Sequence, residues 1–289
     1  MSALLAALFG VSGALVYGAA DFFGGLASRR IGAVLTAGVG SLAGLVILFI
    51  AFPVFGGHWS ADAVLLGVIS GVAGAIALCL LYACLALGPM SVLSPITALM
   101  TAIVPMLWGL LRGERLSLLG YGGLALALVA IVLVAFVPER TAVRASARGI
   151  LMAVGAGSLI GVFLALIDAT PDDSGVLPLL FNRAVNALML FSLLGLLVLR
   201  SRARGGQSEG RAAGGIRIAV LCGSLDGIAN VLLLAGLRTG DLTVVSVLTA
   251  LYPAGTIALA ALVLHERIAR VQAIGLVLAL VAAAILALT

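Results

Sequence analysis

Long apolar runs, separated by short polar breaks, follow one another along the whole chain. A helix needs about 20 mostly apolar residues to cross the hydrocarbon core of a bilayer, and each run has about that length. We therefore expect an all-α membrane protein with ten transmembrane helices. The expected helices lie at 3–20, 33–54, 63–86, 91–111, 117–137, 148–168, 176–199, 216–237, 242–264 and 271–288.

Composition supports lipid as the solvent of this protein. Of 289 residues, 63% are hydrophobic and only 9% are charged, whereas about a quarter of a soluble domain is charged. The net charge of +5 lies in short loops and forms no basic run interleaved with aromatic residues, so we expect no nucleic-acid partner. The expected environment is the cell membrane, taken to be a bacterial plasma membrane, which the chain crosses many times.

Small residues four apart recur within the apolar runs. This spacing lets two helix backbones approach closely in lipid. We interpret these residues as tight packing within the bundle rather than as a dimer contact, and the protein is expected to be a monomer or a homodimer. The clearest pairs are Gly40 and Gly44, Gly67 and Gly71, Gly157 and Gly161, and Gly223 and Gly227.

The chain contains an internal repeat. An offset of 152 residues places Glu114-Arg115 on Glu266-Arg267 and Thr97-Ala98-Leu99 on Thr249-Ala250-Leu251. Nearer the start of each half the offset becomes 147 and pairs Asp21 with Asp168.

The repeat predicts two five-helix halves, 1–138 and 148–289. Because five is odd, the second half enters the membrane from the opposite side, which makes the repeats inverted. Inverted repeats suit a scaffold that opens alternately to either face of the membrane. The sequence therefore favours a transporter.

With these features the chain resembles the EamA-type members of the drug/metabolite transporter superfamily. The resemblance rests on two five-helix halves, a length near 290, Glu114 and Glu266 after the fourth helix of each half, and Pro105 and Pro253 within those helices. The prolines depart from the repeat, since Pro253 falls on Thr101. The resemblance implies export or exchange of small metabolites, amino acids or drugs without ATP hydrolysis.

Ionisable groups inside apolar runs are costly and mark candidate sites. Asp226 lies near the middle of the eighth run with Asn230 one turn later, and the seventh run carries Asn182, Arg183 and Asn186. We expect Arg183 and Asp226 to face each other across a central cavity. Asp226 would exchange a proton or bind an ammonium group and Arg183 would bind a carboxylate, unless the two form a fixed ion pair that only orients their helices.

Other polar and aromatic residues have expected roles at helix ends, in helix bends or beside the cavity. Asp21 and Asp168 fall at the ends of runs, where contacts at a helix end are expected. Glu114 and Glu266 precede a helix, whose free amides a carboxylate caps, with gating as the alternative. Pro105 and Pro253, together with Pro95, predict bends in the fourth and ninth helices. Tyr82, Trp108 and Tyr252 line the cavity or lie at an interface.

The function expected from the sequence is secondary transport of a small molecule by alternating access, with protons as a possible coupling ion. A flippase of a lipid-linked precursor is the main alternative. A membrane-embedded enzyme is less favoured, because the chain has no HExxH, GxSxG or Walker-type motif. No cofactor is expected, and His58 and His265 have no second ligand at metal spacing.

The distribution of arginines and the family resemblance predict opposite orientations of the chain in the membrane. Twelve of the sixteen lie in the odd-numbered loops, and the positive-inside rule then places both termini outside the cell. The family resemblance implies cytoplasmic termini instead.

Overall fold

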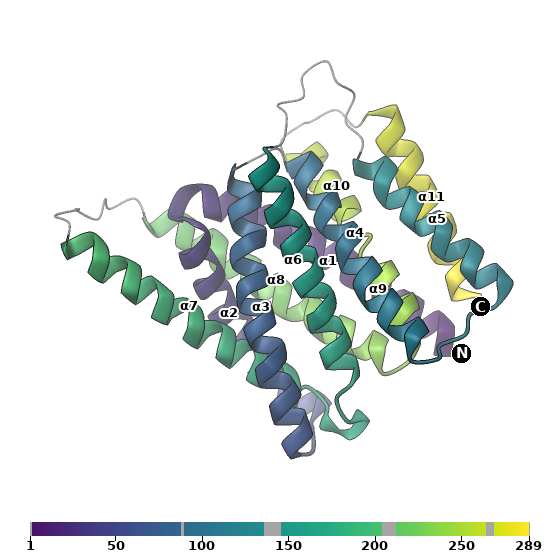
Figure 1. The fold of residues 1–289 in the computed structure, drawn as a ribbon, viewed down its shortest axis with the longest axis horizontal. Helices are drawn as coiled ribbons and strands as arrows, with labels where there is room; N and C mark the ends of the chain where they lie inside the picture. Colours follow the sequence, from purple (N-terminus) through teal and green to yellow (C-terminus); the bar gives the residue numbers. More distant parts are fainter. Residues whose placement is uncertain (1, 88–89, 136–145, 204–211, 264–268, 289) are drawn as a thin grey trace.

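A computed structural model describes residues 2–87, 90–135, 146–203, 212–263 and 269–288. Within these ranges the regular structure is helical, and helices run back and forth through one bundle (Figure 1). The elements are α1 (Ser2–Ile31), α2 (Ala33–Phe55), α3 (Ala61–Leu87), α4 (Met90–Leu111), α5 (Leu118–Ala135), α6 (Ala147–Asp168), the 3₁₀ helix η1 (Asp172–Ser174), α7 (Leu177–Ala203), α8 (Ala212–Leu237), α9 (Leu242–Thr249), α10 (Pro253–Val263) and α11 (Arg270–Ala287).

The surface of the bundle is apolar, as a protein surrounded by lipid requires. Large side chains such as Leu111, Leu118 and Leu262 are 75–91% exposed. By length and composition, seven of the described helices are able to cross a membrane, and shorter apolar helices lie at Leu118–Leu133, Leu242–Thr256 and Arg270–Leu286.

The first helix is longer than the sequence pattern predicted. The expected end near residue 20 is wrong, because α1 continues to Ile31 and has Arg29 and Arg30 in its last turn. Small and aromatic apolar residues follow Asp21, so a single carboxylate does not end the helix. Asp21 consequently lies inside the bundle with 8% of its surface exposed, and its expected position at a helix end is also wrong.

Helices of the first half pack against helices of the second in a reciprocal pattern. The first helix of each half packs against the third helix of the other, as α1 against α8 and α6 against α3. The pairs α2–α8 and α7–α3 repeat this reciprocity, whereas α2–α7, α4–α9 and α5–α11 join equivalent helices. Figure 1 shows α5 beside α11 at one edge of the bundle, with the two chain ends near each other. The halves are therefore interleaved.

Paired glycines allow the closest approach between the halves. A Cβ atom on Gly223 of α8 would overlap the backbone of Gly40 in α2, and one on Gly227 would lie 3.0 Å from the Cα of Gly44. These helices could not pack as they do with larger residues there. The glycine spacing thus holds α8, which carries Asp226, directly against α2.

The ninth apolar run is interrupted rather than continuous. α9 ends at Thr249 and α10 begins at Pro253, and the Tyr252 N–H donates to the Thr249 carbonyl in the turn between them (3.1 Å). Proline has no N–H with which to continue a helical ladder. By contrast, α4 remains one helix through Pro95 and Pro105.

Candidate functional site

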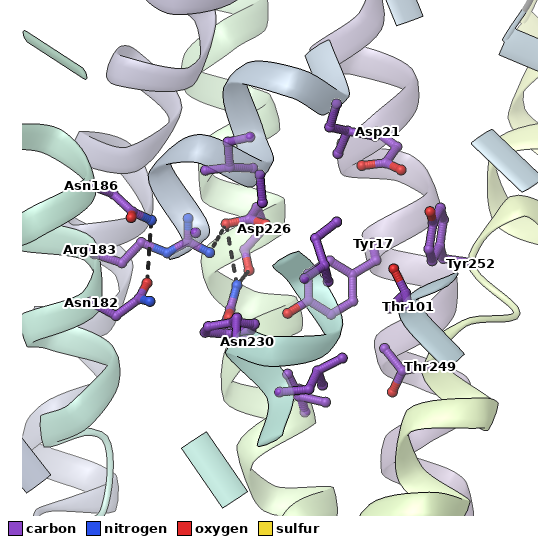
Figure 2. Close-up of a pocket in the computed structure, with 18 residues that line it drawn as sticks. Tyr17, Asp21, Thr101, Asn182, Arg183, Asn186, Asp226, Asn230, Thr249 and Tyr252 are labelled. Atoms are coloured by element: carbon purple, nitrogen blue, oxygen red, sulfur yellow. Dashed lines mark hydrogen bonds and ion pairs between the residues drawn. The ribbon is translucent and has the colours of Figure 1, made fainter. Parts of the chain in front are cut away.

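A cavity of about 70 Å³ lies inside the bundle between helices of both halves. Since one water needs roughly 10–15 Å³ by this measure, the cavity has room for several waters or a small solute. In Figure 2, Asn182, Arg183 and Asn186 of α7 lie on one side, with Asp226 and Asn230 of α8 in the middle. On the other side lie Tyr17, Asp21, Thr101, Thr249 and Tyr252.

Arg183 and Asp226 form a buried ion pair between α7 and α8. The Arg183 Nη2 group donates to the Asp226 Oδ2 atom, and the two residues are only 4% and 8% exposed. Asn230 Nδ2 also donates to Asp226, to its Oδ2 atom at 3.3 Å and to its carbonyl at 2.7 Å. Such a pair offsets its desolvation only when geometry and additional hydrogen bonds are favourable.

Asparagines of α7 extend this polar wall toward α3. Asn186 Nδ2 donates to Asn182 Oδ1 (3.3 Å), and Asn182 Nδ2 donates to Ser70 Oγ (3.0 Å). α3 can lie this close because it has glycine at two facing positions. A Cβ on Gly71 would lie 2.8 Å from the Asn182 carbonyl oxygen, and one on Gly74 would lie 3.2 Å from Asn186 Oδ1.

Several buried polar atoms of the cavity have no hydrogen-bond partner within the part of the chain that the structure describes. They are Arg183 Nε, Asn186 Oδ1, Asn230 Oδ1 and Thr249 Oγ1. Buried polar atoms are nearly always satisfied by protein or ordered water. Ordered water can therefore satisfy these atoms.

The opposite wall contains residues that sequence reasoning missed. Tyr17, Thr101 and Thr249 all line the cavity, and hydroxyl-bearing residues inside apolar runs gave no distinctive signal for them. Tyr252 does line the cavity, and its hydroxyl donates to the Ser94 carbonyl (3.3 Å). Asp21 also lies here, and within the described part of the chain it has no hydrogen bond or ion pair.

The repeat places matching positions around the same cavity. At the offset of 152 residues, Gly74 and Leu78 match Asp226 and Asn230, and all four line it. At the offset of 147, Tyr17 matches Leu164, and both line it as well. The cavity is thus built from equivalent parts of the two halves, with different side chains at those positions.

Two of the three aromatic candidates, which were expected either to line the cavity or to lie at an interface, do not line it. Tyr82 is buried with its hydroxyl 3.1 Å from Cys222 Sγ. Trp108 is 48% exposed, and the Arg112 guanidinium lies 5.6 Å from the centre of its ring. Neither residue is among those that line the cavity.

Glu114 caps a helix of the other half instead of the helix that follows it. Its carboxylate accepts the N–H groups of Leu242 (3.0 Å) and Thr243 (3.1 Å) and the Thr243 hydroxyl, at the first turn of α9. The expectation that it caps α5 is wrong, because Ser117 Oγ already accepts the Gly120 N–H there (3.0 Å). Glu266, its partner in the repeat, lies outside the described residues.

The loop after α6 is held by Arg238, at the end of α8. Asp168 ends α6, as predicted, and it is partly exposed. Arg238 donates to the carbonyls of Thr170 (2.9 Å) and Pro171 (3.1 Å) and to Asp172 Oδ1 (3.2 Å). Burial lowers the pKa of Arg238, and the neighbouring carboxylates oppose that shift.

Among the described residues, no three His, Cys, Asp or Glu side chains are grouped closely enough to hold a metal ion. The cavity is lined by the carboxylates of Asp21 and Asp226, the guanidinium of Arg183 and the amides of three asparagines.

Comparison with known proteins assigns the chain to a family. The EamA-like transporter family matches residues 4–136 and again residues 147–288. A solved crystal structure, described only as that of a protein, has the same fold, with a TM-score of 0.71, 18% identity and coverage of 97% of this chain and 94% of the other. No curated protein matches the sequence. The chain therefore belongs to the EamA-like transporter family, a group of membrane transporters within the drug/metabolite transporter superfamily.

Proposed function

We propose that the protein is a secondary transporter whose two halves are inverted five-helix repeats. In this proposal α9 and α10 together form one interrupted span, so each half crosses the membrane five times. The reciprocal packing of α1 with α8 and of α6 with α3 supports a pseudo-two-fold relation between the halves. An interrupted span beside a cavity is typical of transporters, because unwound backbone is tolerated there.

The central cavity is the main support for this proposal. It lies between the halves and has unpartnered polar atoms of Arg183, Asn186 and Asn230. A small metabolite, amino acid or drug binds there and leaves after the halves move relative to each other, which results in export or exchange. Closely packed glycine contacts, such as Gly40 with Gly223, let helices shift without large side chains interlocking.

Arg183 is the anchor for an acceptor group of the solute. Its Nη2 group binds Asp226, while its Nε group has no partner among the described residues, so a carboxylate or other oxygen can bind without breaking the ion pair. Gly44 lies next to the guanidinium, and a Cβ there would be 3.7 Å from Nε. Protonation of Asp226 would release Arg183 entirely, which is how protons would couple to transport.

Charge distribution suggests the orientation. Arg29 and Arg30 at the end of α1, Arg148 in α6, Arg217 in α8 and Arg270 in α11 all belong to the end of the bundle opposite the termini. Positive residues favour the cytoplasmic side, so both termini face the outside.

Solute counterflow in proteoliposomes tests the function. Candidate solutes come from a growth screen of overexpressing cells against toxic amino acids and antimetabolites. We expect counterflow of at least one water-soluble solute. Arg183→Gln removes a charged hydrogen bond to the solute and should reduce counterflow about ten-fold or more, whereas Leu118→Ala should change it little, because that side chain is 91% exposed. If no water-soluble solute exchanges but a lipid-linked precursor crosses the bilayer, the protein is a flippase; unaltered counterflow in Arg183→Gln would refute the role of that residue.

A further inference from the structure

The charges that line the cavity do not balance. Asp21, Asp226 and Arg183 are the charged residues among its described lining. The single guanidinium is bonded to Asp226. In its ionised form the remaining acid, Asp21, has no counter-ion among these residues, inside a bundle where unpaired charge is strongly disfavoured.

Asp21 lines the cavity instead of bonding to another residue that the structure describes. It lies within α1, ten residues before the end of that helix, is 8% exposed and lines the cavity. It has neither a hydrogen bond nor an ion pair with another residue that the structure describes. Its repeat partner Asp168 lies at the end of α6 outside the cavity, so the second half supplies no equivalent carboxylate.

The surroundings of Asp21 suit an organic cation. Tyr17 lies one turn earlier on α1 and so shares its helix face, and Tyr252 lines the same side of the cavity (Figure 2). Aromatic rings attract ammonium groups through their π faces. Ala77 and Leu81 add apolar contact surface to the lining.

We infer that Asp21 is the binding site for the ammonium group of a small organic amine, with the apolar part of that amine against the lining of α3. This inference rests on the proposed transport function and names a class of solute for it. Asp226 binds the guanidinium of Arg183, and its negative charge offsets the repulsion between that guanidinium and the ammonium. An amine that also carries a carboxylate can bind both walls, with its acid at Arg183.

An inorganic ion fits these observations less well. A metal ion requires several oxygen ligands converging at fixed distances, whereas Asp21 is the only carboxylate on its wall among the described residues. An ammonium group needs one carboxylate and accepts aromatic faces as its other partners.

Binding to the purified full-length protein tests the inference without requiring transport. The probes are phenethylammonium, its uncharged match 2-phenylethanol and the anion 3-phenylpropionate, each titrated by calorimetry. We expect phenethylammonium to bind at least about ten-fold more tightly than 2-phenylethanol. Asp21→Asn should remove that preference, Asp21→Glu should retain most of it, and Asp62→Asn should change nothing because Asp62 is exposed at the start of α3.

Other outcomes overturn the inference. Equal binding of the charged and uncharged probes, or an unchanged preference in Asp21→Asn, would show that Asp21 does not bind the ammonium. Thermal stabilisation by sodium chloride that is lost in Asp21→Asn, with no effect of the amine, would assign the site to an inorganic ion. If Asp21→Asn does not fold, the wild type and Asp21→Glu are compared instead. Equal binding of phenethylammonium and 2-phenylethanol to either of them would then overturn the inference.

This experiment separates the two proposals. Counterflow of neutral or anionic solutes together with no amine binding would leave the transporter intact and remove only the ammonium site. Amine binding without counterflow of any solute would contradict the transport function instead.

Discussion

Glu114 binds Thr243 across the two halves of the molecule. The carboxylate comes from the loop between α4 and α5 and accepts both the N–H (3.1 Å) and the hydroxyl of Thr243, at the start of α9. Because α9 ends at the cavity with Thr249, this contact ties one end of the cavity wall to the opposite half.

Replacement of Glu114 should destabilise the contact between the two halves. Glu114→Ala leaves two N–H groups at the α9 N-terminus without their acceptor, and loss of a cap costs about 1–2 kcal/mol. We expect a lower melting temperature of the purified protein. Asp62→Asn, which removes an exposed acid at the first turn of α3, is the matched control, and an equal loss in both variants would show that Glu114 has no special role.

Single and double changes at the buried ion pair should differ. Asp226→Leu leaves the Arg183 charge buried and unpaired, which costs about 3–5 kcal/mol. Arg183→Met combined with Asp226→Leu removes both charges and should recover most of that stability in denaturant unfolding.

The same double variant distinguishes a structural pair from a functional one. We expect it to fold but to lose solute counterflow, since the anchor for the solute is gone. A double variant that transports like the wild type would mean that the pair only orients α7 and α8.

The glycine contact between α2 and α8 should not tolerate a methyl group. In Gly223→Ala the new Cβ would overlap the backbone of Gly40, and overpacking of this kind costs about 1–3 kcal/mol. Gly195→Ala in α7 is the control, because a Cβ there meets nothing within 4 Å. Thermal stability in detergent should fall in the first variant and hold in the second; the reverse order would contradict the described packing.

Arg238 should matter through backbone carbonyls more than through its salt bridge. Arg238→Gln loses hydrogen bonds to Thr170 and Pro171 and should cost about 2–3 kcal/mol. Asp172→Asn should cost little, because the Asp172 side chain is 96% exposed and such pairs contribute about 0–1 kcal/mol. Unfolding curves of the two variants provide the comparison, and similar losses would make the ion pair the main contact.

The sequence indicated the helices and part of the cavity for physical reasons. Hydrophobic length located nearly every helix to within a few residues, because lipid imposes that length. The cost of ionisable groups in lipid pointed to Arg183 and Asp226, which the structure places together. These signals are local and need no knowledge of how the helices pack.

What the sequence could not indicate depends on packing between distant segments. The depth of Asp21 required knowing that α1 continues beyond it. Tyr82 turns to Cys222 rather than to the cavity, and Glu114 reaches α9 because Ser117 already caps α5. Each outcome is decided by a neighbour from another part of the chain, which hydropathy does not reveal.

Cysteine labelling at Thr249 tests the central claim most directly. The variant Thr249→Cys, with Cys79, Cys84 and Cys222 replaced by alanine, carries one thiol in the cavity wall. If two inverted repeats open the cavity alternately, a membrane-impermeant maleimide should react when added to either side of the membrane, and a transported solute should slow both reactions. Reaction from neither side, or from one side only regardless of solute, would contradict an alternately exposed cavity.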